Sequence, residues 1–157
     1  MIIFEKLRVG VATVSAEETR SLAAELAAAL PPDTTLALHG DLGAGKTTFV
    51  QGLARGFGIA EPVTSPTFTI FTLHRAPSPA LRSSPSKSEG ECMLVHLDAY
   101  RLDDPWQIEA LMLDDFLVSP WCLAIEWPEK IAAWLPDNTL HLALGIADDG
   151  RHTIQLR

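Results

Sequence analysis

The residues most able to do chemistry lie in one glycine-rich stretch, GDLGAGKTTF, at positions 40–49. Positions 40–47 match the pattern G-x-x-x-x-G-K-[ST] at every fixed position, and a short apolar run, TTLALH, precedes them. This pattern is the P-loop, or Walker A motif, in which backbone N–H groups converge on a polyphosphate. Glycines suit such a loop because they leave room for the phosphates and adopt positive φ without strain. We therefore expect a nucleotide-binding site here rather than a flexible turn.

Within this loop, the residue types indicate specific contacts. Lys46 is expected to reach the β- and γ-phosphates, and the Thr47 hydroxyl is expected to bind Mg²⁺. The helix that begins near Lys46 adds the partial positive charge of its N-terminus. Further contacts to the nucleotide are expected from the neighbouring positions, which are Asp41, Leu42, Gly43, Ala44, Gly45 and Thr48.

Two apolar strands each end in a carboxylate. The run MLVHLD ends in Asp98, and the run CLAIEW carries Glu126. Ligands of open α/β sheets bind beyond the carboxyl ends of the strands, so both side chains are expected at the same site. One could hold Mg²⁺ and the other could orient an attacking water, which would make both residues catalytic together with Lys46. The pattern does not assign the two roles, and an ordinary strand-end charge stays open at either position.

A third feature is the segment TSPT at positions 64–67. Its hydroxyl side chains around Pro66 could form a loop that responds to the γ-phosphate and includes Thr67. A simple proline turn before a strand is an equal alternative. Trp127 directly follows Glu126, and we expect its ring at the site, whereas the other three tryptophans are assigned to packing.

Alternating strands and helices are expected to position these residues. Helices are predicted over 15–30, with Ser15 and Glu18 as a capping box, over 47–59, from Pro105, and over 128–135. Strands are predicted over 1–13, 34–39, within 63–73, within 93–102 and over 122–127, followed by a closing hairpin of 139–147 and 151–157. The fold class is therefore α/β: one P-loop NTPase-like three-layer domain over residues 1–157, with a mostly parallel central sheet and antiparallel edge strands. Residues 75–90, rich in proline and serine, are predicted to be a long exposed loop.

Composition limits the function classes. The chain has 157 residues, 47% of them hydrophobic, and a net charge of −8. An acidic surface argues against direct binding of nucleic acid, so any RNA is expected to be held by a partner. No apolar run is long enough to span a membrane and no signal peptide is evident, which predicts a cytoplasmic protein. Its two cysteines are expected to be reduced thiols.

Taken together, these motifs resemble one family, the bacterial TsaE (YjeE) ATPases of tRNA threonylcarbamoyladenosine biosynthesis. The stretches that carry the resemblance occur in the family's order and are SAEET, LHGDLGAGKTTFVQGLARGFGI, VTSPTFTI, HLDAYRLDDP and AIEWPEKI. Many folds share the P-loop, whereas the combination of SPTF, HLDAYR and IEWPE is specific to this family. The long loop at 75–90 departs from the shorter connection that is usual in the family.

The resemblance implies an activity and partners. It implies that the protein binds ATP and Mg²⁺, hydrolyses ATP slowly when alone, and acts on the complex of TsaB with TsaD, which modifies the tRNA. Residue by residue, it implies phosphate binding by Lys46, magnesium binding by Thr47, and acidic site residues at Asp98 and Glu126, with Glu126 the better magnesium ligand. It also places three further features at the nucleotide, namely Thr67 in a switch-like loop, Trp127, and the segment around Thr13 and Ser15 beside the base.

Two other functions are compatible with a P-loop. A small phosphotransferase of this size would need an acceptor pocket and a lid with several arginines, whereas the only lid-sized insertion carries Arg75, Arg82 and Lys87 spread along it. A non-catalytic module, in which nucleotide binding alone drives docking to a partner, is the other alternative. Phosphoryl transfer faster than hydrolysis would favour the first, and full function after loss of Glu126 would favour the second.

Overall fold

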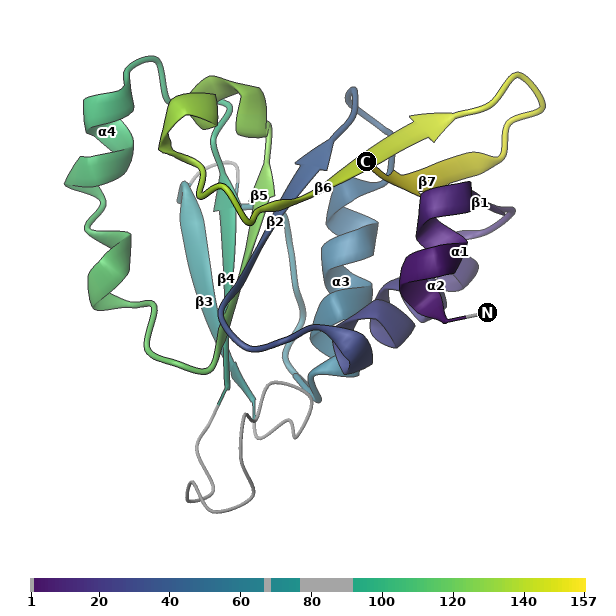
Figure 1. Cartoon of the computed structure of the whole chain (residues 1–157), viewed down its shortest axis with the longest axis horizontal. Coiled ribbons are helices and arrows are strands. Elements are labelled where there is room, and N and C mark those ends of the chain that lie inside the picture. The colour runs from purple at the N-terminus through teal and green to yellow at the C-terminus, as the bar shows by residue number, and fades with distance from the viewer. Residues whose placement is uncertain (1, 67–68, 77–91) are drawn as a thin grey trace.

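The described residues form one seven-stranded sheet with helices on both faces (Figure 1). The computed structural model describes residues 2–66, 69–76 and 92–157. In sheet order the strands are β1 (Val11–Thr13), β7 (His152–Leu156), β6 (Leu140–Ile146), β2 (Thr34–His39), β5 (Trp121–Glu126), β4 (Cys92–Asp98) and β3 (Phe71–Ala76). The four central strands, β6, β2, β5 and β4, run parallel, and β3, β7 and β1 pair antiparallel at the edges. This topology confirms the predicted fold class.

Each face of the sheet is covered by its own set of helices. One set consists of α1 (Ile3–Val9), α2 (Ala16–Ala29) and α3 (Lys46–Gly56), and the other of α4 (Pro105–Ala110) with the 3₁₀ helices η2 (Leu113–Asp115) and η3 (Pro128–Trp134). In Figure 1, α4 lies on the opposite side of the sheet from α1, α2 and α3. Leu36 and Leu38 of β2 pack with α2 and α3, whereas Val95 of β4 and Leu123 of β5 pack toward α4 and η3. Burial on both faces explains why the central strands are apolar throughout.

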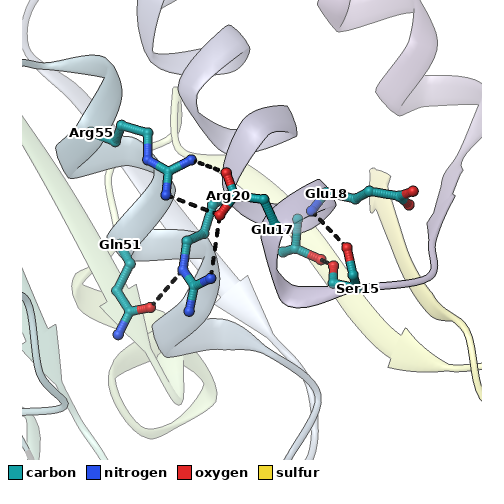
Figure 2. A network of polar contacts seen from close by, with 7 residues as sticks. Ser15, Glu17, Glu18, Arg20, Gln51 and Arg55 are labelled. Atoms are coloured by element: carbon teal, nitrogen blue, oxygen red, sulfur yellow. Dashed lines mark hydrogen bonds and ion pairs between the residues drawn. The ribbon is translucent and has the colours of Figure 1, made fainter.

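The helix α2 is capped as its sequence predicts. The Ser15 hydroxyl accepts a hydrogen bond from the Glu18 N–H at 3.1 Å (Figure 2). The Glu18 carboxylate accepts from the Val14 N–H at 2.8 Å, one residue earlier than in an ideal capping box. At its other end the helix stops at Ala29, directly before Leu30 and the two prolines.

A polar network joins α2 to the P-loop helix α3. The Glu17 carboxylate pairs with the Arg55 guanidinium and lies 3.6 Å from that of Arg20 (Figure 2). Arg20 donates to Gln51 at 3.1 Å, and Gln51 donates at 3.0 Å to the carbonyl of Val63. The network therefore links α2, through α3, to the start of the loop that carries Ser65.

The N-terminal segment differs from the prediction of a strand over 1–13. Residues Ile3–Val9 form α1, and only Val11–Thr13 form a strand. Ile3 and Leu7, one helical turn apart, are both buried, and the Gly10 N–H closes the helix on the Lys6 carbonyl. An apolar pair four residues apart suits a helix, and docking on α2 and β7 decides between the two structures.

Three other predictions change in detail. Residues 128–134 form a 3₁₀ helix interrupted at Ile131, where the backbone leaves helical φ and ψ, rather than a regular α-helix. Arg75 and Ala76 belong to β3 rather than to the predicted loop, and the other residues of that prediction, 77–90, lie outside the described residues. Trp106 was expected to pack but is 65% exposed, while Trp121 and Trp134 do pack in the core near α4. Among the described residues, no helix has the length and apolar character needed to cross a bilayer.

Both cysteines are buried thiols, which leads to a prediction of their reactivity. Burial raises the pKa of Cys122 from its ordinary value of 9.0 to about 12. We expect no reaction of either thiol with Ellman's reagent in the native protein at pH 8, and two thiols per chain after denaturation. Folding raises this pKa, so the thiol contributes stability that is present below pH 9 and lost as the pH rises toward 12. Rapid labelling of the native protein would contradict the burial.

Candidate nucleotide-binding site

The P-loop connects β2 to α3 at the carboxyl end of the central strands. Gly45 has φ 100° and immediately precedes the first residue of α3, so an L side chain here would be strained. A hydrogen bond from the Ala44 N–H to the Asp41 carbonyl, at 3.0 Å, shapes the turn before it. The loop thus directs the N-terminus of α3 toward the edge of the sheet where ligands of open α/β sheets bind.

A cavity of about 460 Å³ lies beside this loop. Most of the predicted site residues line it, together with Ser65 and His152. The lining residues are Leu42, Gly43, Gly45, Lys46, Thr47, Thr48, Ser65, Asp98, Glu126, Trp127 and His152. Residues from five separate parts of the chain therefore meet in one place.

The two strand-end carboxylates lie next to each other. Asp98 of β4 pairs in register with Glu126 of β5, and the two residues are 7% and 4% exposed. The Thr47 hydroxyl oxygen lies 3.4 Å from each oxygen of the Glu126 carboxylate. Hydroxyl and carboxylate oxygens are the ligands that Mg²⁺ prefers, and Mg²⁺ usually keeps several waters, so this donor set fits the ion.

Lys46 is held at the base of the cavity and is only 5% exposed. Its ammonium donates to the Gly40 carbonyl at 2.5 Å and lies 3.6 Å from the centre of the Trp127 ring. Burial lowers the pKa of Lys46, and the negative charge of Glu126, Asp98 and other nearby carboxylates partly offsets this effect. The amine is thus a positioned cation beside two acidic groups.

Trp127 takes its position through an unusual backbone conformation. Its φ is 56°, in the left-handed region between β5 and η3. Its ring contacts the Lys46 ammonium and also packs against Tyr100, with 5.3 Å between ring centroids. Left-handed residues other than glycine are uncommon and often occur at functional sites, which agrees with a position in the cavity wall.

Comparison with known proteins identifies the family. Residues 13–154 match the family model described as "Threonylcarbamoyl adenosine biosynthesis protein TsaE". The chain belongs to the TsaE family. The tRNA threonylcarbamoyladenosine biosynthesis protein TsaE of Bacillus subtilis is 37% identical over 142 residues, covering 90% of this chain and 80% of the relative. That of Streptomyces coelicolor is 40% identical over 139 residues, covering 85% of this chain and 86% of the relative.

A solved structure supports the same assignment. The crystal structure of Bacillus subtilis YdiB matches with a TM-score of 0.70 and 32% sequence identity, covering 94% of this chain and 82% of that one. The family match begins at Thr13, so the helix α1, over Ile3–Val9, precedes the part of the chain that the TsaE model matches.

Several residues predicted at the site lie beside the cavity rather than on its wall. Thr13 is buried, shares a 2.7 Å hydrogen bond with Thr19, and pairs with the cavity residue His152 across β1 and β7. Ser15 uses its hydroxyl to cap α2. Asp41 and Ala44 shape the loop but do not line the cavity. Thr67 lies outside the described residues, so its predicted role stays a prediction.

Two histidines at the site have no counterpart among the sequence predictions. The Nδ1 atom of His152 on β7 donates to the Ala44 carbonyl at 3.1 Å, which braces the P-loop from the C-terminal hairpin. His96 on β4 lies 2.6 Å from Glu126. Neither histidine shows metal-ligand spacing, and both contact residues distant in the sequence, so no local pattern singles them out. Only the HLDAYR stretch, which contains His96, offered a hint.

Proposed function

We propose that this chain is a Mg²⁺-dependent ATPase that serves threonylcarbamoyladenosine modification of tRNA by acting on the TsaB–TsaD complex. One observation carries the proposal: the Thr47 hydroxyl faces both oxygens of the Glu126 carboxylate at 3.4 Å, in the cavity that Lys46 and the P-loop line. The role in the modification pathway follows from family membership, since the relatives are described as tRNA threonylcarbamoyladenosine biosynthesis proteins.

Each residue has a distinct part in the proposed chemistry. The P-loop N–H groups and the Lys46 ammonium bind the phosphates of ATP, and the Trp127 ring holds the Lys46 cation in place. Thr47 and Glu126 hold Mg²⁺, which supplies neutralisation of the phosphate charge when bound. Asp98, beside Glu126, is placed to orient water for attack on the γ-phosphate.

The same cavity explains why a partner is proposed. None of its described lining residues is an arginine. An arginine supplied to a phosphoryl-transfer site is worth about 10³–10⁵ in rate, so a site without one should turn over slowly. We propose that the TsaB–TsaD complex completes or rearranges the site, and that tRNA is contacted only through that complex.

The test is ATP hydrolysis by the purified chain, with and without TsaB–TsaD. We expect weak hydrolysis that needs Mg²⁺ and rises at least about tenfold with the partners. Hydrolysis that does not respond to a correctly assembled complex would overturn the partner-dependent mechanism. Transfer of the phosphate to a small acceptor faster than to water would favour the phosphotransferase alternative.

Replacing Lys46 with alanine is expected to abolish measurable hydrolysis and to weaken ATP binding. The variant loses the only lysine of the described cavity wall, and its phosphate contact is not replaced. Binding is measured by titration calorimetry with ATP and Mg²⁺. Lys6→Ala is the matched control and should behave as wild type. It removes a partly exposed lysine of α1, which pairs with Glu25 and does not line the cavity. Wild-type hydrolysis by Lys46→Ala would contradict the assigned site.

A further inference from the structure

Beneath the cavity, a buried histidine contacts the acidic residue proposed to bind magnesium. His96 lies on β4 two residues before Asp98, and its side chain is 0% exposed. Its Nε2 atom is 2.6 Å from Oε2 of Glu126. Among the described residues, its other ring nitrogen, Nδ1, has no hydrogen-bond partner. The bond to Glu126 is therefore the single polar contact that the described residues give this imidazole.

Packing alone does not explain a histidine at this buried position. A buried polar nitrogen without a partner is unfavourable, and an aliphatic side chain at the same position would avoid that loss. Leu94, which faces the same side of β4 as His96, is apolar and fully buried. The imidazole is thus better explained by what its Nε2 atom does than by packing.

The geometry determines which ring nitrogen carries the proton. An ionised carboxylate only accepts hydrogen bonds, so Nε2 must be the donor to Glu126. This bond fixes one carboxylate oxygen, Oε2, through a residue that does not itself line the cavity. Thr47 approaches both oxygens at 3.4 Å from the P-loop helix. The carboxylate is thereby held between β4 and α3, with its remaining lone pairs available to the cavity.

We propose that His96 is a positioning residue that orients the Glu126 carboxylate for magnesium binding. The proposal rests on the function proposed above and adds a residue to it. Partners that hydrogen-bond to a metal ligand fix the orientation of that ligand, and their loss typically lowers metal affinity or activity by about 10–100-fold. Loss of His96 should therefore weaken the response to Mg²⁺ more than the binding of the nucleotide itself.

Three variants at this position separate positioning from packing. In His96→Gln the terminal amide nitrogen lies near the position of Nε2, in His96→Asn it lies near Nδ1, and His96→Leu keeps the volume without a donor. Nucleotide binding is titrated with MgCl₂ by intrinsic tryptophan fluorescence, and kcat is measured with TsaB–TsaD present. We expect the Mg²⁺ concentration at half-saturation to rise about tenfold or more, and kcat to fall similarly, in the Asn and Leu variants, while Gln stays within about threefold of wild type.

A double-mutant comparison tests the proposal when a single variant at position 96 folds poorly. In a Glu126→Gln background, His96→Asn should cause little further loss, because the residue it positions is already altered. Additive losses would overturn the proposal. So would a folded His96→Leu variant with wild-type magnesium dependence, or a Gln variant as impaired as Leu.

A measurement without nucleotide separates this proposal from the proposed function. In ¹⁵N-histidine NMR spectra of the ligand-free protein, His96 should be protonated at Nε2, with a proton that exchanges slowly with water. Protonation at Nδ1 alone would overturn the positioning role even if the protein hydrolyses ATP. If the predicted tautomer is found and the wild type hydrolyses no ATP, the contact stands and the proposed ATPase function is what fails.

Discussion

Replacing Glu126 with glutamine is expected to lower ATP hydrolysis by about 10²–10⁴-fold. The substitution keeps the size of the side chain and leaves an amide oxygen that can still accept from His96, so the fold should be retained. It removes the negative charge beside Thr47, which the proposed chemistry needs whether Glu126 holds Mg²⁺ or orients water. The measurement is kcat in the presence of TsaB–TsaD, together with the Mg²⁺ concentration at half-saturation.

The paired variant Asp98→Asn separates the roles of the two carboxylates. If Glu126 holds the ion, Glu126→Gln should raise the Mg²⁺ requirement more than Asp98→Asn does, while both lower kcat. Glu109→Gln, an exposed glutamate on α4, is the matched control and should leave both quantities unchanged. A folded Glu126→Gln protein with wild-type turnover would favour the non-catalytic module, in which nucleotide binding alone drives docking.

The largest expected effect on stability comes from Gly52, at the crossing of α3 and α2. A Cβ atom at this position would lie 2.4 Å from the Arg20 carbonyl oxygen, 2.7 Å from Arg20 Cα and 2.6 Å from Ala23 Cβ. Two of these atoms belong to the α2 backbone, so the helices must move apart. Alanine in place of a helical glycine normally adds about 1 kcal/mol of stability. Here we expect Gly52→Ala to destabilise the protein by about 1–3 kcal/mol instead, and Gly52→Val by more.

Urea unfolding followed by circular dichroism measures these changes. The alanine and valine variants at position 52 serve as controls for each other, since the loss of stability should be greater for valine than for alanine. Combining Gly52→Ala with Ala23→Gly removes one of the three close contacts and should recover part of the loss. A Gly52→Ala protein as stable as wild type would show that the two helices have room to separate without cost.

The local motifs of the sequence determined the centre of the site. The P-loop is a contiguous pattern whose residues act through their own backbone, so Lys46 and Thr47 could be placed from spacing alone. Asp98 and Glu126 could be placed because the carboxyl ends of parallel strands meet at one edge of a sheet, and alternation of strands with helices predicts such a sheet. The same alternation predicted the α/β class and the parallel centre, and two apolar runs joined by the turn sequence DDG predicted the C-terminal hairpin.

The tertiary structure alone decided the features that depend on contacts between distant segments. The bonds of His152 to Ala44 and of His96 to Glu126 join residues 108 and 30 positions apart, and no spacing rule connects them. The segment Ile3–Val9 is compatible with either a strand or a helix by itself, and its packing on α2 and β7 selects the helix. A short apolar pattern shows which residues are buried, but it does not distinguish a helix from a strand. The elements that pack over the buried residues decide between the two conformations.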